Sequence, residues 1–259
     1  MLGLYDSGLG GLTVLAALRA AGIDQDVVYF ADQAHLPYGD KSDVQLHGFL
    51  RENLALLGEL RVDAVVTACN TTCAVAERLG WPSTDFPVLD LIATAGASFA
   101  GTTYRRIGVV ATVATVRSGA YERAIRAAAP GGAEVFALAA PALVPLVERG
   151  DTETSAARDA VAAVVAELPR DLDALVYGCS HYPLLDRWFA AALAPNVARI
   201  DPAHAQAGAA ARLVAARSLA PGTSATTYYT NGDAAAFEAA VRRWTGDAYG
   251  RVAALAVSS

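Results

Sequence analysis

Short apolar runs alternate with longer amphipathic stretches along this chain. Runs of about four to seven apolar residues predict buried strands, and stretches with apolar residues three or four positions apart predict helices. In the first part of the chain these are strands over 2–5, 27–31, 63–68 and 88–91, and helices over 12–20, 43–60, after Cys69 to about 79, and from about 94. Strands that alternate with helices are typical of a parallel α/β sheet.

The same order of elements restarts near residue 107. It predicts strands over 107–112, 133–138 and 172–178, and helices over 115–129, 141–149, 155–168 and 184–193. Residues 63–70 resemble residues 173–180 at an offset of 110, and residues 4–7 fall opposite 109–112 at an offset of 105. This internal repeat indicates two similar α/β lobes.

The rest of the chain follows Asp201-Pro202. It predicts a helix to about 219, a strand over 226–230, a helix over 233–244 and a strand over 252–257. We expect this tail to return to the first lobe. The predicted fold is therefore α/β, with two pseudo-symmetric lobes that each hold a mainly parallel sheet flanked by helices, and with an active site in the cleft between them. The first lobe is expected over 1–92 plus 207–259 and the second over 93–206.

The composition favours a compact protein of the cytoplasm. Hydrophobic residues make up 54% of the chain and charged residues 18%, which excludes a disordered chain. No apolar run reaches the roughly 18 residues of a membrane span, and the first residues contain no secretion signal, so we expect no membrane association. The three cysteines form no even disulfide set, and a reducing compartment would keep them as thiols.

The charged residues narrow the choice of partners and cofactors. The net charge is −6 and the 19 arginines are scattered, which argues against nucleic-acid binding and leaves a small molecule as the expected partner. The chain has a single lysine, Lys41, and therefore one candidate for the Schiff base of a pyridoxal-phosphate enzyme. Chemistry on an amino acid is expected to proceed without that cofactor. The sequence leaves a homodimer open.

Two cysteines occupy corresponding places in the repeat. Cys69 and Cys179 each follow an apolar run and precede polar residues, so each is predicted at the carboxyl end of a strand, where helix N-termini offer free N–H groups. Asp6-Ser7 and Thr112 are expected at the same edges. If the two edges face each other, they enclose a cleft with a thiol on each wall. Racemisation of an amino acid needs an arrangement of this kind, because one group removes the α-proton from one face and another returns a proton to the other face.

Each candidate residue also has a simpler interpretation. A strand-end cysteine is often only a small buried hydrophobic residue, and Cys73 is expected to face the core on the next helical turn. The repeated context of Cys69 and Cys179 favours chemistry, and a helix N-terminus would lower the pKa of each thiol and favour a reactive thiolate. His181 is then a candidate proton shuttle for Cys179.

Parts of the sequence also resemble two other kinds of site. Gly8-Leu9-Gly10-Gly11 after a strand resembles a dinucleotide-binding turn, but Thr13 replaces the last glycine and the charge of Asp6 would oppose a pyrophosphate. The turn also lacks the lysine of a P-loop. Cys69, Cys73, Cys179 and His181 do not have a common zinc spacing, so no metal site is predicted.

Several longer motifs occur in order along nearly the whole chain. The main ones are Tyr5-Asp6-Ser7-Gly8-Leu9-Gly10-Gly11-Leu12, Pro37-Tyr38-Gly39-Asp40-Lys41-Ser42, Ala68-Cys69-Asn70-Thr71, Val144-Pro145-Leu146-Val147-Glu148 and Gly178-Cys179-Ser180-His181-Tyr182-Pro183-Leu184-Leu185. Ile200-Asp201-Pro202 and Thr230-Asn231-Gly232-Asp233 extend the series towards the end of the chain. Together these motifs resemble those of glutamate racemases, in the aspartate/glutamate racemase superfamily.

The resemblance implies a cofactor-independent, two-base racemase that makes D-glutamate for peptidoglycan. It implies that Cys69 and Cys179 are the paired acid/base thiols and that Asp6, His181 and Glu148 assist proton movement. It also implies substrate contacts from Asp6, Ser7, Tyr38, Gly39, Asn70, Thr71, Ser180 and His181. Simpler roles stay open for Asp6, as a helix cap, and for Glu148, as a solvated carboxylate.

The resemblance also sets out the alternatives. Ser180 stands where the family usually has threonine and keeps the hydroxyl. The two thiols favour racemisation over decarboxylation, and the Pro-Tyr-Gly loop favours glutamate. An aspartate racemase or another two-cysteine racemase is the alternative within the same chemistry. A non-catalytic protein, such as an inhibitor of DNA gyrase, is the alternative of another class.

Overall fold

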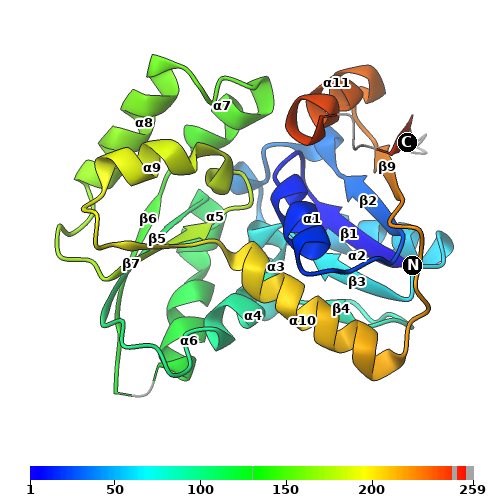
Figure 1. Cartoon of the computed structure of the whole chain (residues 1–259), viewed down its shortest axis with the longest axis horizontal. Coiled ribbons are helices and arrows are strands. Elements are labelled where there is room, and N and C mark those ends of the chain that lie inside the picture. The colour runs from blue at the N-terminus through cyan, green and yellow to red at the C-terminus, as the bar shows by residue number, and fades with distance from the viewer. Residues whose placement is uncertain (130, 247–249, 255–259) are drawn as a thin grey trace.

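The computed structural model describes residues 1–129, 131–246 and 250–254 and contains two parallel sheets (Figure 1). The strands are β1 (Leu2–Asp6), β2 (Val27–Ala31), β3 (Ala64–Thr67), β4 (Val88–Leu89), β5 (Arg106–Ala111), β6 (Glu134–Ala139), β7 (Ala174–Gly178), β8 (Ala198–Ile200), β9 (Thr226–Thr230) and β10 (Arg251–Ala254). The α-helices are α1 (Gly11–Ala20), α2 (Asp43–Glu59), α3 (Asn70–Leu79), α4 (Leu91–Ala97), α5 (Val113–Ser118), α6 (Ala120–Ala128), α7 (Leu143–Arg149), α8 (Ser155–Ala166), α9 (Asp186–Ala192), α10 (Pro202–Arg217) and α11 (Ala234–Thr245). Three short 3-10 helices are η1 (Gln33–His35), η2 (Tyr38–Asp40) and η3 (Tyr182–Leu185).

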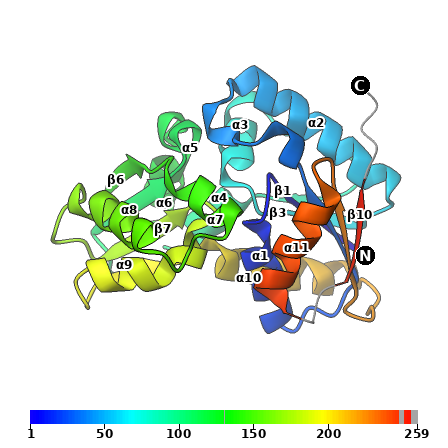
Figure 2. The same ribbon diagram turned by 90° about the horizontal axis from the view of Figure 1, so that it is seen from above.

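The first sheet is buried on both faces by helices. Its strand order is β10-β9-β2-β1-β3-β4, and all of its pairs are parallel. Leu4 and Tyr29 pack in one core with α1, α10 and α11, whereas Tyr5 and Phe30 pack in another with α2. Figure 2 shows α2 and α3 on one side of this sheet and α1, α10 and α11 on the other. Burial on both faces explains why the strands are continuous apolar runs rather than alternating ones.

The second sheet has the order β6-β5-β7-β8 and is covered in the same way. Val109 and Val176 pack in a core with α4 and α6. Leu175 and Tyr177 pack in another core with α7, α8 and α9. The second sheet therefore has the same layered construction as the first, and the prediction of an α/β fold with two mainly parallel sheets is confirmed.

The internal repeat of the sequence is also a repeat of structure. The order β2-β1-β3-β4 in the first sheet recurs as β6-β5-β7-β8 in the second. Leu2 pairs with Ala64, and Ile107 pairs with Ala174, which are the residues related by the offsets of 105 and 110. The corresponding strands therefore share both their order and their pairing register.

The tail of the chain adds two strands to the first sheet. β9 pairs with β2, and β10 pairs with β9. Of the strand expected over 252–257, residues 255–257 lie outside the described residues. The two expected lobe boundaries fall inside α4 and α10, which are joined by a 2.7 Å hydrogen bond from Thr94 Oγ1 to Gln206 Oε1. The division into lobes at these points stays a prediction.

Three predicted elements were wrong in detail. The single helix expected over 115–129 is divided into α5 and α6 at Gly119, whose φ of +67° is left-handed and ends a helix. The strand expected over 88–91 stops at Leu89, because Asp90 caps α4 by accepting a 3.0 Å hydrogen bond from the N–H of Ala93. α4 therefore begins at Leu91, three residues before the expected start.

Strand β8 was not predicted at all, because its three residues are too few to show a period. Pairing with the edge of β7 holds these residues extended. In the described part of the chain, no helix is long and apolar enough to cross a membrane.

Candidate active site

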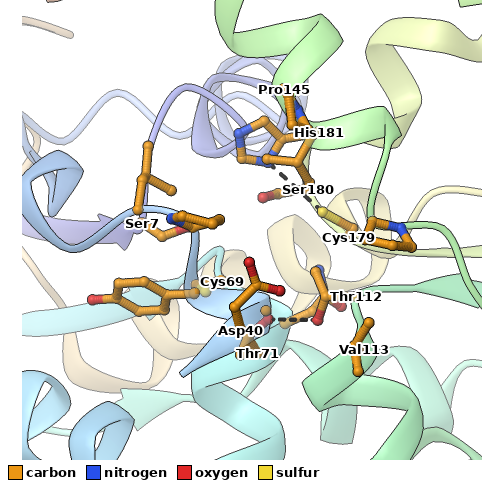
Figure 3. Close-up of a pocket in the computed structure, with 17 residues that line it drawn as sticks. Ser7, Asp40, Cys69, Thr71, Thr112, Val113, Pro145, Cys179, Ser180 and His181 are labelled. Atoms are coloured by element: carbon orange, nitrogen blue, oxygen red, sulfur yellow. Dashed lines mark hydrogen bonds between the residues drawn. The ribbon is translucent and has the colours of Figure 1, made fainter. Parts of the chain in front are cut away.

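A cavity of about 100 Å³ lies where the carboxyl ends of the two sheets meet (Figure 3). Its volume is well below the roughly 300–1,000 Å³ of sites for drug-sized ligands, so it suits a small molecule. The residues that follow β1, β3, β5 and β7 all contribute to the wall. The lining residues are Ser7, Leu36, Pro37, Tyr38, Gly39, Asp40, Cys69, Asn70, Thr71, Thr112, Val113, Pro141, Val144, Pro145, Cys179, Ser180 and His181.

Cys69 forms the wall on the side of the first sheet. It is the N-cap of α3, it is 4% exposed, and its sulfur faces the cavity in Figure 3. Burial, reinforced by the negative charge of Asp6, raises the pKa of the Cys69 thiol to about 12. Hydrogen bonds from Ser7 and Thr72 oppose this shift without cancelling it. The expectation of a lowered pKa at the helix N-terminus was therefore wrong for Cys69, because removal from water outweighs the helix end.

Cys179 forms the wall on the side of the second sheet. It follows β7, is 5% exposed, and faces the same cavity. Its sulfur lies 3.7 Å from Nδ1 of His181, the dashed line between these two residues in Figure 3. The two thiols thus come from corresponding strands of the repeat, and only Cys179 has an imidazole beside it.

His181 links Cys179 to Glu148, which lies behind it on α7. His181 Nε2 lies 2.5 Å from Glu148 Oε1, and this oxygen also accepts a 2.9 Å hydrogen bond from the N–H of Leu9. Burial alone would lower the pKa of His181, but Cys179 and Glu148 together raise it well above its ordinary value. Burial would likewise raise the pKa of Glu148, but His181 and the N–H of Leu9 outweigh burial and lower it. The imidazolium and the carboxylate therefore form a buried ion pair.

Asp6 is the ionisable group behind Cys69, as His181 and Glu148 are behind Cys179. It is fully buried, and its Oδ2 accepts hydrogen bonds from the N–H groups of Gly8 (3.1 Å) and Gly11 (3.0 Å). Its Oδ1 accepts a hydrogen bond of 3.1 Å from the hydroxyl of Ser180. Burial raises the pKa of Asp6, although His181 and these donors oppose the rise. Asp6 therefore caps the glycine-rich turn. It also places beside Cys69 a carboxyl group that binds a proton more tightly than an ordinary aspartate does.

The glycine-rich turn after β1 is packed against this cluster. A Cβ atom at Gly8 would lie 2.2 Å from Oε1 of Glu148, and one at Gly10 would lie 2.3 Å from Oγ of Ser180. Side chains of the second sheet thus occupy the space beside these glycines. Close packing between the two halves explains the glycines, and a nucleotide is not needed to explain them.

Polar groups at the start of α3 complete the wall. Oδ1 of Asn70 accepts a 2.6 Å hydrogen bond from the hydroxyl of Tyr121, but Nδ2 of Asn70 has no partner among the described residues although it is buried. The hydroxyl of Thr71 lies 2.9 Å from that of Thr112, which follows β5 in the other half of the repeat. Burying a hydrogen-bond donor without a partner lowers the stability of the folded protein. Asn70 Nδ2 is therefore available to donate a hydrogen bond to a ligand in the cavity.

The structure brings nine of the predicted site residues to the cavity itself. These are Ser7, Tyr38, Gly39, Cys69, Asn70, Thr71, Cys179, Ser180 and His181. Asp6 and Glu148 do not line it and lie one layer behind. Thr112 lies at this edge, as expected, and also lines the cavity, although the sequence did not predict it as a site residue. The sequence likewise did not predict seven further lining residues, Leu36, Pro37, Asp40, Val113, Pro141, Val144 and Pro145. The family motifs contain Pro37, Asp40, Val144 and Pro145, and these motifs were the signal that could have found them.

Two of the residues weighed for other sites lie elsewhere. Cys73 is fully buried in the core, with its sulfur 3.1 Å from Oγ1 of Thr67, and it does not line the cavity. Lys41 is also not among the lining residues. Over residues 1–129, 131–246 and 250–254, no group of three or more His, Cys, Asp or Glu side chains is placed to hold a metal ion.

Several known proteins with similar sequences and folds are glutamate racemases. The family model for Asp/Glu/hydantoin racemases matches residues 13–210. A glutamate racemase from Gloeobacter violaceus is 41% identical over 259 residues, which cover 99% of this chain and 96% of the relative. The structure of glutamate racemase isoform RacE1 from Bacillus anthracis is 29% identical, with a TM-score of 0.91 over 99% of this chain and 97% of that one. That of glutamate racemase from Thermus thermophilus, in complex with β-chloro-D-alanine, is 34% identical, with a TM-score of 0.84 over 99% and 96% of the two chains.

Proposed function

Because the chain belongs to the family of aspartate, glutamate and hydantoin racemases, we propose that its cavity interconverts L- and D-glutamate with Cys69 and Cys179 as the two acid/base groups. The observation that carries the proposal is the pair of thiols. They follow corresponding strands of the two sheets and line one cavity from its two sides. This is the arrangement that proton transfer on both faces of one α-carbon requires.

The surroundings of the two sulfurs support different resting roles. Cys69, with its pKa of about 12, holds its proton at neutral pH and is the acid. The base for the opposite face is then Cys179, whose sulfur lies 3.7 Å from Nδ1 of His181. Cys179 takes the α-proton from one face of the substrate, and Cys69 gives its own proton to the opposite face. The product of opposite configuration leaves a thiol at Cys179 and a thiolate at Cys69.

After one turnover Cys179 carries a proton and Cys69 has none, and the groups behind the thiols can exchange these protons with solvent. Asp6 can take a proton from solvent and pass it to the Cys69 thiolate. The imidazolium of His181 can give its Nε2 proton to Glu148, which releases it to solvent, and can then accept the proton of Cys179 at Nδ1. Both enantiomers are substrates, because the reverse reaction exchanges the roles of the two sulfurs.

The donors of the cavity wall account for binding of an anionic substrate by a protein of net charge −6. Asn70 Nδ2 and the N–H groups at the start of α3 can hold a carboxylate. The N–H groups of Tyr38 and Gly39 open the 3-10 helix η2, so they have no acceptor within that helix. Ser7, Thr71, Ser180 and His181 supply the remaining polar contacts. Reactive thiols suit a reducing compartment, so we place the enzyme in the cytoplasm, where its D-glutamate would serve peptidoglycan synthesis.

The direct test follows the α-proton by NMR. Purified protein without added cofactor is mixed in heavy water with D-glutamate, L-glutamate, D-aspartate or L-aspartate. We expect loss of the α-proton signal and racemisation for both glutamate enantiomers, and for neither aspartate. Exchange of aspartate alone would assign the cavity to aspartate, and no exchange of any amino acid would overturn the proposed function.

Cysteine variants test the mechanism. Cys69→Ala and Cys179→Ala should abolish racemisation, because each leaves one face of the substrate without an acid/base group. Each variant should exchange the α-proton of at most one enantiomer with retained configuration, and the two variants should differ in which one. Cys73→Ala is the matched control, because this buried thiol lies outside the cavity and its loss should leave racemisation intact. Racemisation by either of the first two variants at the wild-type rate would refute the two-thiol mechanism.

A further inference from the structure

A buried carboxylate at the start of the loop 32–40 collects side chains from distant parts of the chain. Asp32 is fully buried directly after β2. Its Oδ2 accepts a short hydrogen bond from the hydroxyl of Tyr38 and one of 3.0 Å from Nδ2 of Asn53. Its Oδ1 lies 2.7 Å from Nδ1 of His35 and accepts a 2.5 Å hydrogen bond from Nδ2 of Asn231. Neither oxygen of this carboxylate is left unsatisfied.

Asn231 brings the end of strand β9 into this cluster. Thr230 pairs with Ala31 in the sheet, so the next residue of each strand, Asn231 and Asp32, lie side by side. Asn231 binds the loop twice, because its Oδ1 also accepts a 2.9 Å hydrogen bond from the N–H of Ala34. Two hydrogen bonds from one amide define both the position and the direction of the loop where it leaves β2.

The same loop forms one side of the cavity. Tyr38 and Gly39 both line it, and a Cβ atom at Gly39 would lie 3.3 Å from Cβ of Thr112, on the opposite wall. The loop is therefore packed closely across the site. A shift of a few tenths of an ångström at Tyr38 changes the space available to the substrate and the aim of the N–H groups in η2.

We infer that Asn231, which lies outside the cavity, is a positioning residue for substrate binding: through Asp32 it holds the Tyr38–Gly39 loop in its binding position. The inference rests on the proposed function, since it concerns the same cavity. The chain of contacts runs from Asn231 Nδ2 to Asp32 and from Asp32 to the hydroxyl of Tyr38.

The test compares three variants. Asn231→Ala removes both hydrogen bonds to the loop. Tyr38→Phe removes the hydroxyl at the other end of the link, which also lies 2.8 Å from the hydroxyl of Tyr5 and accepts a 3.4 Å hydrogen bond from Nδ2 of Asn53. Asp233→Ala is the control, because Asp233 is two residues from Asn231 and accepts hydrogen bonds from the N–H groups of Ala235 and Ala236 but, among the described residues, has none with the loop. It should cost stability as a lost helix cap does and leave the kinetic constants unchanged.

We expect Asn231→Ala to raise KM for glutamate about tenfold while kcat changes by less than about threefold, because the loop binds the substrate and does not move protons. L- and D-glutamate have equal free energy, so kcat/KM must fall by the same factor in both directions. This equality checks the measurement. In the double variant Asn231→Ala/Tyr38→Phe, the rise in KM should be well below the product of the rises in the two single variants, because both substitutions act through Asp32.

Hydrogen exchange measured by mass spectrometry gives a readout that does not depend on racemisation. Peptides covering 32–42 should exchange faster in Asn231→Ala and in Tyr38→Phe than in the wild type or Asp233→Ala. If wild-type protein does not racemise glutamate, the proposed function fails, and the exchange data still decide the positioning role. Unchanged KM and unchanged exchange over 32–42 in Asn231→Ala would overturn the inference, as would fully multiplicative effects in the double variant.

Discussion

At the scale of single residues, the two thiols have similar access but different electrostatic surroundings. Cys69 and Cys179 are 4% and 5% exposed, so solvent reaches them about equally. Cys69 lies beside the carboxyl group of Asp6, which with burial raises its pKa to about 12, whereas Cys179 has His181 at 3.7 Å. A two-base racemase needs one proton donor and one acceptor at any moment, and in the proposed mechanism Cys69, whose pKa is raised, is the donor.

Alkylation should report the raised pKa of Cys69. Iodoacetamide should modify Cys69 slowly at pH 8 and about tenfold faster for each pH unit above it, since only the thiolate reacts and each pKa unit is worth a factor of ten. Asp6→Asn should speed the modification of Cys69, because it removes a charge that raises the pKa of this thiol, while racemisation falls about 100-fold with the loss of a proton carrier. Mass spectrometry of the labelled peptides measures each rate. A rate at Cys69 that does not rise with pH, or full turnover in Asp6→Asn, would contradict these roles.

At the scale of elements, the helix that follows β5 shows how one glycine changes a prediction. The apolar spacing continues from α5 into α6 and indicates one helix, yet Gly119 separates them with a left-handed φ of +67°. The break allows α5 to remain beside η2 at the cavity while α6 packs on α4 against the second sheet. Side-chain periodicity does not report the backbone conformation of a single residue, so the sequence pattern missed this turn.

A pair of glycine variants tests that account. Gly119→Ala should destabilise the protein by about 1–2 kcal/mol, because a Cβ atom is strained at this φ. The melting temperature should fall by about 2–4 °C per kcal/mol. Gly48→Ala is the matched control in the middle of α2, where a new Cβ atom would meet nothing within 4 Å, and it should stabilise by about 0.5–1 kcal/mol. Urea unfolding measures both. A stabilising Gly119→Ala would show that the left-handed turn is not required.

At the scale of the whole molecule, buried polar contacts join the halves of the repeat around the site. Glu148 accepts a hydrogen bond from Leu9, and Asp6 accepts one from Ser180. Thr71 and Thr112 meet across the cavity with their hydroxyl oxygens 2.9 Å apart. The relative position of the two sulfurs depends on these contacts, because each sulfur belongs to a different sheet.

The Glu148–His181 pair should make part of the folding stability depend on pH. Folding lowers the pKa of Glu148. Its contribution to folding stability is therefore complete above its pKa in the unfolded chain, about 4.3, and is lost as the pH falls through its lower pKa in the folded protein. Folding raises the pKa of His181. Its contribution to folding stability is therefore complete below its pKa in the unfolded chain, about 6.5, and is lost as the pH rises through its higher pKa in the folded protein. The difference in melting temperature between wild type and Glu148→Gln should therefore be largest between about pH 4.3 and 6.5. A difference that stays constant from pH 4 to 9 would refute the ion pair.

Local pattern in the sequence was enough to predict most of the fold. The strands Val27–Ala31 and Thr226–Thr230 were predicted to the residue, because each is a run of strand-forming side chains between clear breaks. The offsets of 105 and 110 anticipated the register of the two sheets, since a repeated sequence folds into a repeated unit. The three-residue strand β8 was not predicted, because its extended conformation depends on pairing with β7.

The sequence by itself determined the α/β class, the repeat and the placing of both thiols at strand ends, because strand and helix periods are local properties of the chain. Only the tertiary structure decided the protonation state of the Cys69 thiol. Burial and Asp6 raise the pKa of Cys69, and Glu148, which the sequence left open as a solvated carboxylate, lies against His181. The hydrogen bond from Asn231 to Asp32 is likewise visible only in the tertiary structure. These effects depend on charges and hydrogen bonds between residues far apart in the chain, which local spacing does not report.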